Sequence, residues 1–144
     1  MNKYTILIML FSTCLIAACS KSDNTKLSAE KSLELSKKCS DQSIIAFKQL
    51  GFKVGTTDFY ENHYNNKLNK CFILIQSPIA TASANKQLID AFELKSYAYW
   101  EVRFDNKKLE NAFQVCEITI PNEPKKLCKS ADDFDKFVSA YMNE

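Results

Sequence analysis

Glycine is scarce in this chain of 144 residues, which has only Gly51 and Gly55. Loops that cradle phosphate groups need several glycines, because their backbone approaches the phosphate closely and adopts conformations that side chains hinder. The scarcity therefore argues against the usual kinds of nucleotide chemistry. Histidine is represented by His63 alone, and the sequence has no Cys-x-x-Cys pair. An ordinary zinc site is not expected either, and we predict no cofactor.

A strong charge of either sign is also missing. The sequence has 19 basic and 17 acidic residues, which gives a formal net charge of +2. Proteins that bind nucleic acid usually present a strongly basic surface. Lysine pairs such as Lys107-Lys108 and Lys125-Lys126 are interpreted as solvated turns. The composition therefore predicts no nucleic-acid partner.

The chain begins with a short apolar segment that ends in a cysteine. Lys3 supplies an early positive charge, and residues 4–18 are almost all apolar. About 15 apolar residues are fewer than the ~20 of a membrane-spanning helix, but they suit the apolar region of a signal peptide. The alternatives are a permanent transmembrane helix, or Cys14 and Cys19 as ordinary core cysteines. With its ending Ile16-Ala17-Ala18-Cys19, the segment resembles a bacterial lipoprotein signal peptide with its lipobox.

This resemblance implies cleavage before Cys19 and attachment of lipid, including palmitate, to the Cys19 thiol. Such lipoproteins carry two or three acyl chains, and each buried CH₂ contributes ~0.8 kcal/mol, so the anchor is firm. In Gram-negative lipoproteins an Asp after the lipidated cysteine favours the inner membrane, whereas this chain has Ser20. We therefore expect an outer-membrane lipoprotein on the periplasmic face. Its parts would be a signal peptide (1–18), the lipidated cysteine with a polar tether (19–27) and one domain (28–144).

Four cysteines then remain for the exported domain: Cys39, Cys71, Cys116 and Cys128. An even number of cysteines in the oxidising periplasm predicts two disulfides. Cys116 and Cys128 flank a predicted strand end and a turn that contains prolines, where a bridge would join the strand to the next element. Of the three possible connectivities, we predict Cys116 with Cys128 and therefore Cys39 with Cys71.

Two segments have the apolar period of a helix. The first runs from about Ser28 to Leu50 and is stopped by Gly51. The second follows Ser130, a favourable N-cap residue, and has acidic side chains in its first turn. Its apolar stripe is formed by Phe134, Phe137, Val138, Tyr141 and Met142. Asp132 and Asp133 could instead belong to a metal site, but capping explains them without further assumption.

The middle of the chain has the patterns of strands and turns. The predicted strands cover residues 58–65, 71–75, 97–104 and 112–120. Residues 87–92 could form another strand or a short helix, and the sequence does not decide. The inward-facing parity switches between Val115 and Cys116, which indicates a β-bulge there. The order predicts an α+β fold, with an antiparallel β-sheet of about four to five strands, an N-terminal and a C-terminal helix, and two disulfides.

Residues with catalytic potential are few. His63 is the only candidate general base, and Tyr60 and Tyr64 bracket it. A nucleophile activated by histidine needs a nearby Ser or Cys and usually an orienting carboxylate, and the sequence assigns neither. The pair Glu61 and Glu101 could serve glycoside hydrolysis, but nothing in the spacing singles it out. We therefore predict that the protein is not an enzyme.

The region around His63 also carries a resemblance. Residues 60–72 resemble a stretch that recurs in small uncharacterised exported bacterial proteins, and this implies no particular activity. His63, Tyr60 and Tyr64 could form a binding region. The other interpretation is that the neighbouring asparagines supply turn conformations and that His63 faces solvent or bonds locally.

The segment 97–104 supplies the other candidate binding residues. Its alternation places Tyr97, Tyr99 and Arg103 on one face of a half-buried strand. Tyrosine and arginine are enriched at the energetic centres of protein interfaces. We therefore expect a membrane-anchored recognition module, of the inhibitor or immunity type, with a periplasmic protein as its partner. The alternatives are an envelope structural or assembly component and a binder of a small ligand or wall fragment, with a hydrolase third.

Overall fold

The computed structural model describes residues 28–78, 83–105 and 108–143, without the side chains of residues 104–113. The predicted signal peptide and tether lie outside these residues. The elements are α1 (Ala29–Gln49), β1 (Phe59–Asn65), β2 (Lys70–Ser77), β3 (Ser83–Asp90), β4 (Lys95–Asp105), β5 (Lys108–Ile118), β6 (Lys126–Leu127) and α2 (Ala131–Met142). Within the described ranges, no helix is both long and apolar enough to cross a membrane.

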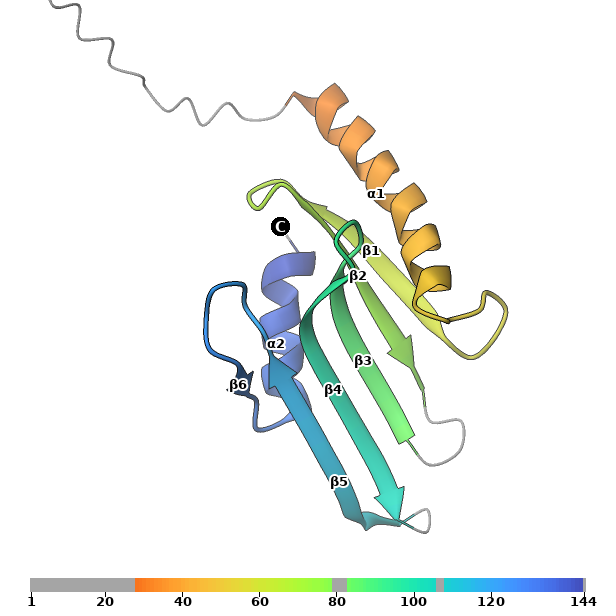
Figure 1. Ribbon diagram of the computed structural model, residues 1–144, viewed down its shortest axis with the longest axis vertical. Coiled ribbons are helices and arrows are strands. Elements are labelled where there is room, and N and C mark those ends of the chain that lie inside the picture. The colour runs from red at the N-terminus through yellow and green to blue at the C-terminus, as the bar shows by residue number, and fades with distance from the viewer. Residues whose placement is uncertain (1–27, 79–82, 106–107, 144) are drawn as a thin grey trace, which may run out of the picture.

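The strands form one antiparallel sheet in the order β1-β2-β3-β4-β5-β6, so each strand pairs with the next one along the chain (Figure 1). The predicted α+β class is confirmed, with six strands instead of four to five. Residues 87–90 belong to strand β3, and a turn follows at 91–94, which decides the segment that the sequence left open. The additional strand is β6, whose two residues pair with Glu117 and Ile118 of β5.

The two helices cover opposite faces of the sheet. Along β2, Cys71, Ile73 and Ile75 pack in one core cluster with residues of α1. The alternate residues Phe72 and Leu74 pack in a second cluster with residues of α2. Because neighbouring side chains of a strand point to opposite faces, β2 is buried on both sides. Its continuous apolar run predicted this burial on both faces, although β2 lies second in the sheet, next to the edge strand β1, rather than at its centre.

Local signals fix the ends of the helices. The Ser28 hydroxyl accepts a hydrogen bond from the Lys31 amide at 3.2 Å, and Gly51 follows α1 with a φ of +90°, which favours glycine. Before α2, the Ser130 hydroxyl accepts from the Asp133 amide at 3.2 Å. The Asp133 carboxylate in turn accepts from the Lys129 amide at 3.0 Å. These bonds confirm the capping interpretation of the acidic first turn.

Both predicted disulfides are present. Cys39 of α1 is bonded to Cys71 of β2, with 5.3 Å between the Cα atoms. Cys116 of β5 is bonded to Cys128 just after β6, with 5.1 Å between the Cα atoms. The first bridge joins α1 to the sheet, and the second holds the segment of β6 beside β5. Each helix-covered face of the sheet therefore contains one covalent link.

The bulge predicted between Val115 and Cys116 is wrong. These residues pair without interruption with Glu101 and Trp100 of β4. One register shift lies instead between β3 and β4, where Leu88 pairs with Ala98 but Ile89 pairs with Ser96. Tyr97 is therefore the extra residue of a bulge, and such a residue leaves the strict alternation of its strand. The prediction was wrong because it assumed that only one face of this strand is apolar. Both faces of the sheet bury side chains, so apolar residues at neighbouring positions such as Val115 and Cys116 do not require a bulge.

Candidate functional site

Tyr97 does not belong to an exposed binding face, which corrects the expectation from alternation. Its side chain lies in the core under α2 and is only 3% exposed. The ring makes edge contacts with Phe72, at 5.1 Å between centroids, and with Tyr141, at 5.6 Å. Burial raises the pKa of its hydroxyl. Tyr97 is thus a structural residue that the bulge turns inward.

Tyr99 and Arg103 do share a face with one another and with Glu101. Trp100, between them, packs against the cluster under α2, so these three residues lie on the opposite side of β4. On that side α1 packs on β1 and β2, and Figure 1 shows β4 and β5 beyond the span of this helix. We call Tyr99, Glu101 and Arg103 the β4 triad.

The β4 triad is bound together by three hydrogen bonds. The Tyr99 hydroxyl donates to Glu101 Oε2 at 2.7 Å. Arg103 donates from Nε to Glu101 Oε1 at 2.7 Å and from Nη2 to Oε2 at 3.1 Å. Arg103 is exposed, while Glu101 beneath it is only 8% exposed. A bidentate contact of this kind requires the planar fork of arginine, and Arg103 is the only arginine in the sequence.

The electrostatics of the β4 triad keep it in one protonation state at neutral pH. The hydrogen bond from Arg103 lowers the pKa of Glu101, against the effect of its burial. Burial, and then the hydrogen bond to Glu101, raises the pKa of Tyr99 to about 12. Tyr99 is therefore a protonated donor and Glu101 a carboxylate. The Arg103 guanidinium is held by its Nε and Nη2 edge, which leaves the Nη1 donors outside this pair.

Neighbouring strands extend this face. Asn85 of β3 and Val115 of β5 are the register partners of Glu101. The Asn85 Oδ1 atom is shielded from solvent and has no hydrogen-bond partner among the described residues. Glu117 of β5 forms an ion pair with Lys125 at 2.6 Å. Asn85 carries no signal of a site in the sequence, since residues 83–86 lack a clear strand pattern and strand register is not visible in sequence.

His63 and its two flanking tyrosines do not form one site. Tyr60 packs against Phe47 of α1 in a tilted arrangement, with 4.8 Å between ring centroids, and Tyr64 is buried in the same cluster. His63 pairs with Phe72 in register and so lies on the other face of β1. Its Nε2 atom is shielded from solvent and lacks a hydrogen-bond partner in the described part of the chain. The structure therefore separates the three residues that the sequence brackets together.

The asparagines after β1 have the turn role that the sequence suggested. Asn65 Oδ1 accepts from the Leu68 amide at 2.8 Å, and its side-chain nitrogen donates to the Tyr141 carbonyl oxygen at 3.2 Å. Asn69 has a φ of +52°, a conformation that asparagine adopts more readily than most residues, and its Oδ1 accepts from the Tyr64 hydroxyl. This turn interpretation is confirmed.

The acidic pair considered for hydrolysis is also separated. Glu61 pairs in register with Leu74 and therefore lies on the α2 side of β1, whereas Glu101 lies on the opposite side of β4. Strands β2 and β3 stand between them. Across residues 28–78, 83–105 and 108–143, no group of three His, Cys, Asp or Glu side chains could hold a metal ion.

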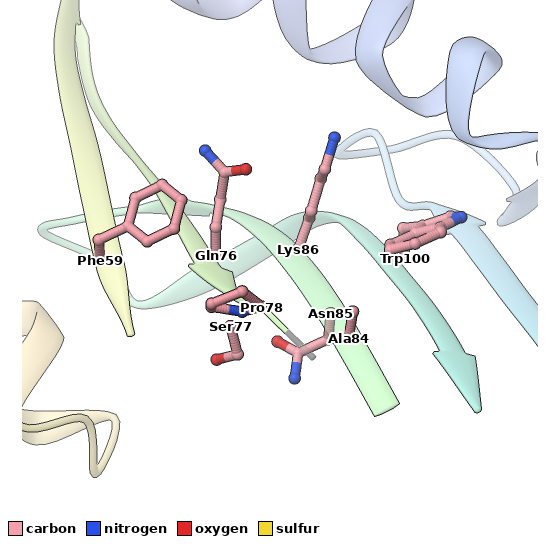
Figure 2. A pocket seen from close by; sticks show the side chains of 8 residues that line it. All are labelled: Phe59, Gln76, Ser77, Pro78, Ala84, Asn85, Lys86 and Trp100. Atoms are coloured by element: carbon pink, nitrogen blue, oxygen red, sulfur yellow. The ribbon is translucent and has the colours of Figure 1, made fainter. Parts of the chain in front are cut away.

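A recess of about 270 Å³ lies on the α2 side of the sheet, near the end of β2 and the start of β3. Figure 2 shows Phe59, Gln76, Lys86 and Trp100 pointing to the same side, toward the ribbon of α2. Lys86 Nζ lies 5.9 Å from the centre of the Trp100 ring and pairs with Asp135 of α2 at 2.7 Å. Ligand pockets usually have volumes of ~300–1,000 Å³, so this recess is slightly smaller than the usual range.

Comparison of the chain with protein-family models, with curated proteins and with solved structures finds no match. The features that can indicate a function are therefore the lipobox-like sequence, the β4 triad and the recess.

Proposed function

We propose that this protein is an outer-membrane lipoprotein of a Gram-negative bacterium, and that its domain recognises a protein partner in the periplasm. The sequence before Cys19 supports the anchor. The Cys39–Cys71 and Cys116–Cys128 bridges support an oxidising compartment, in which structural disulfides persist. An inhibitor or immunity protein is the type of module that we favour.

The β4 triad is the observation that carries the recognition proposal. Binding normally costs side-chain entropy, and a side chain already fixed by its neighbours loses less of it. Glu101 fixes the guanidinium of Arg103, and Tyr99 fixes Glu101 in turn. An ordered, exposed arginine beside a half-buried tyrosine is the composition of an interface hot spot. The partner would present an acceptor, such as a carboxylate, to the Nη1 donors of Arg103.

We assign no catalytic role to His63 or to its neighbours. His63 is the only histidine, and its two nitrogens would need a nucleophile and an orienting acceptor to act in acyl transfer. Its Nε2 atom has neither as a hydrogen-bond partner among the described residues. Tyr60 and Tyr64, its neighbours in sequence, face α1 on the other side of the sheet.

The test is affinity capture from an envelope extract, followed by mass spectrometry, with the purified lipidated protein as bait. We expect one periplasmic protein to be retained by the wild type and lost with Arg103→Ala. Titration of the identified partner should show a loss of at least ~1 kcal/mol, or about fivefold in affinity. Lys136→Ala is the matched control, because Lys136 is an exposed cation of α2. Equal capture by wild type and Arg103→Ala would refute recognition through the β4 triad.

The recess supports a second candidate, the binding of a small apolar ligand or wall fragment. Phe59, Pro78, Ala84 and Trp100 provide apolar contacts there, and Gln76 and Lys86 provide polar ones. On this alternative, Phe59→Ser would abolish binding of the compound while Arg103→Ala would leave it unchanged. The opposite pattern is expected for the recognition module.

A further inference from the structure

Exposed apolar side chains stand on two turns at one end of the sheet. The first turn, residues 66–69, joins β1 to β2, and the second, residues 91–94, joins β3 to β4. Leu68 is 48% exposed and Phe92 is 58% exposed, and Leu94 is exposed as well. Solvated turns favour Gly, Asn, Asp, Ser and Pro. The presence of Phe and Leu at these positions is therefore not explained by turn formation. Figure 1 shows both turns at the end of the sheet where α1 begins.

The second turn is held by several contacts at its base. Asp90 Oδ1 accepts from the Phe92 and Glu93 amides at 3.0 and 3.1 Å. Lys70, at the end of the first turn, pairs with Asp90 at 2.5 Å and with Glu93 at 2.9 Å. Leu94 has a φ of +53°, which is uncommon for a leucine. The two turns are therefore fixed relative to one another, with their apolar side chains outward.

Lysines flank these apolar side chains. Lys67 lies in the first turn, and Lys95 is exposed directly after the second. The two acidic groups of the second turn, Asp90 and Glu93, are both paired with Lys70. Apolar residues with neighbouring lysines suit a phospholipid surface, where the apolar groups enter the headgroup region and the ammonium groups remain at the phosphates.

The start of α1 brings the chain to the same end of the molecule. Cys39 is bonded to Cys71, the second residue of β2, so the ten helical residues 29–38 extend past this level of the sheet (Figure 1). At 1.5 Å per residue, they cover about 15 Å. The nine residues 19–27 can span at most about 30 Å. A chain anchored at Cys19 is therefore long enough for the turns to reach the membrane that holds it.

We propose that Leu68, Phe92 and Leu94, flanked by Lys67 and Lys95, form a membrane-contact surface that rests on the phospholipid leaflet. This inference rests on the lipid anchor of the proposed function. Contact through the turns would also orient the domain on the membrane, because β4 starts at Lys95 and runs away from the membrane-contact surface. Arg103 is eight residues further along, or about 27 Å at 3.3–3.4 Å per residue. Contact through the turns would thus hold Arg103 well out in the periplasm.

The test uses the full lipidated protein in vesicles of phosphatidylethanolamine and phosphatidylglycerol with brominated acyl chains, which quench tryptophan at membrane depth. In the wild type, the tryptophan emission comes only from Trp100, the single tryptophan of the sequence. Phe92→Trp and Leu68→Trp each add a second tryptophan on the turns. Val54→Trp is the matched control, since Val54 is 70% exposed on the loop between α1 and β1, at the opposite end of the sheet. Circular dichroism checks that each variant is folded.

We expect the added emission of Phe92→Trp and Leu68→Trp to be quenched in brominated vesicles, and that of Val54→Trp to match its value in unbrominated vesicles. Flotation of the protein with the vesicles is measured in the same samples. If the protein floats but Phe92→Trp is quenched no more than Val54→Trp, the membrane-contact surface is refuted and the anchor stands. If the protein does not float, both the lipid anchor and the membrane-contact surface are refuted. Loss of a captured protein with Phe92→Ser, without quenching at position 92, would make these turns a protein interface and overturn the inference.

Discussion

The rings of Tyr97 and Phe72 pack edge to face, with 5.1 Å between their centroids and 83° between their planes. Tyr97 reaches this position because the bulge at its place in β4 turns it to the α2 side of the sheet. Strict alternation would have put it beside Tyr99 on the other side. The bulge therefore divides a run of aromatic residues into a core tyrosine and a surface tyrosine.

This division predicts different effects for two similar substitutions. Tyr97→Ala should lower the free energy of unfolding by about 3–5 kcal/mol, because it removes a fully buried aromatic ring. Tyr99→Ala, at a half-buried position, should lower it by only ~1 kcal/mol. Urea unfolding followed by circular dichroism measures both. A smaller loss for Tyr97→Ala than for Tyr99→Ala would show that the bulge is misplaced.

The ion pair of the β4 triad predicts a pH-dependent contribution to stability. Arg103 lowers the pKa of Glu101 below its ordinary value of 4.5. A carboxyl group whose pKa is lower in the folded state stabilises the fold above its unfolded pKa, and this stabilisation is lost as the pH falls through the folded pKa. Glu101→Gln should therefore cost about 1 kcal/mol at pH 7, and the difference from wild type should shrink as the pH falls below 4.5.

Urea unfolding of wild type and Glu101→Gln over a series of pH values measures this difference. Glu34→Gln is a suitable control, because the Glu34 carboxylate pairs with Lys31 and Lys38 on the exposed surface of α1. Such surface pairs contribute little. A difference for Glu101→Gln that stays constant with pH would contradict the lowered pKa.

The two disulfides should contribute unequally. By loop-closure entropy, the Cys39–Cys71 bridge contributes about 3.7 kcal/mol and the shorter Cys116–Cys128 loop about 2.9 kcal/mol. We therefore expect Cys39→Ser with Cys71→Ser to lower the free energy of unfolding more than Cys116→Ser with Cys128→Ser. Chemical unfolding of the two double variants measures this, and non-reducing peptide mapping of the wild type checks the pairing. The reverse order of stability would count against the entropic account.

Processing of the N-terminal segment gives the last prediction. Cys19→Ala should leave an uncleaved precursor, because in lipoproteins the transfer of lipid to the cysteine precedes cleavage. Immunoblots of envelope fractions from expressing cells distinguish the precursor from the mature protein by size. Recovery of the ordinary mature species, free in the periplasm, would refute the lipobox interpretation.

The features of this fold that the sequence determined depend on interactions between residues close together in the chain. The caps at Ser28 and Ser130, the stop at Gly51 and the turn at Asn69 depend on hydrogen bonds and backbone angles within a few residues. The apolar periods of α1 and α2 and the two-sided apolar run of β2 gave the α+β class. The disulfide pairing was also predictable, because only four cysteines follow Cys19 in the sequence and because Cys116 and Cys128 are close to one another.

Tertiary packing decided where the surface residues lie. Alternation relates neighbouring residues of one strand, but a single extra residue reverses it, so the place of Tyr97 depended on the β3–β4 register. Strand order decides in the same way that Asn85 lies beside Glu101 and that Glu61 lies far from it. The grouping of Leu68 and Phe92 at one end of the sheet is likewise absent from any local pattern. These relationships join residues distant in sequence, and they arise because both faces of the sheet must bury their apolar side chains at once.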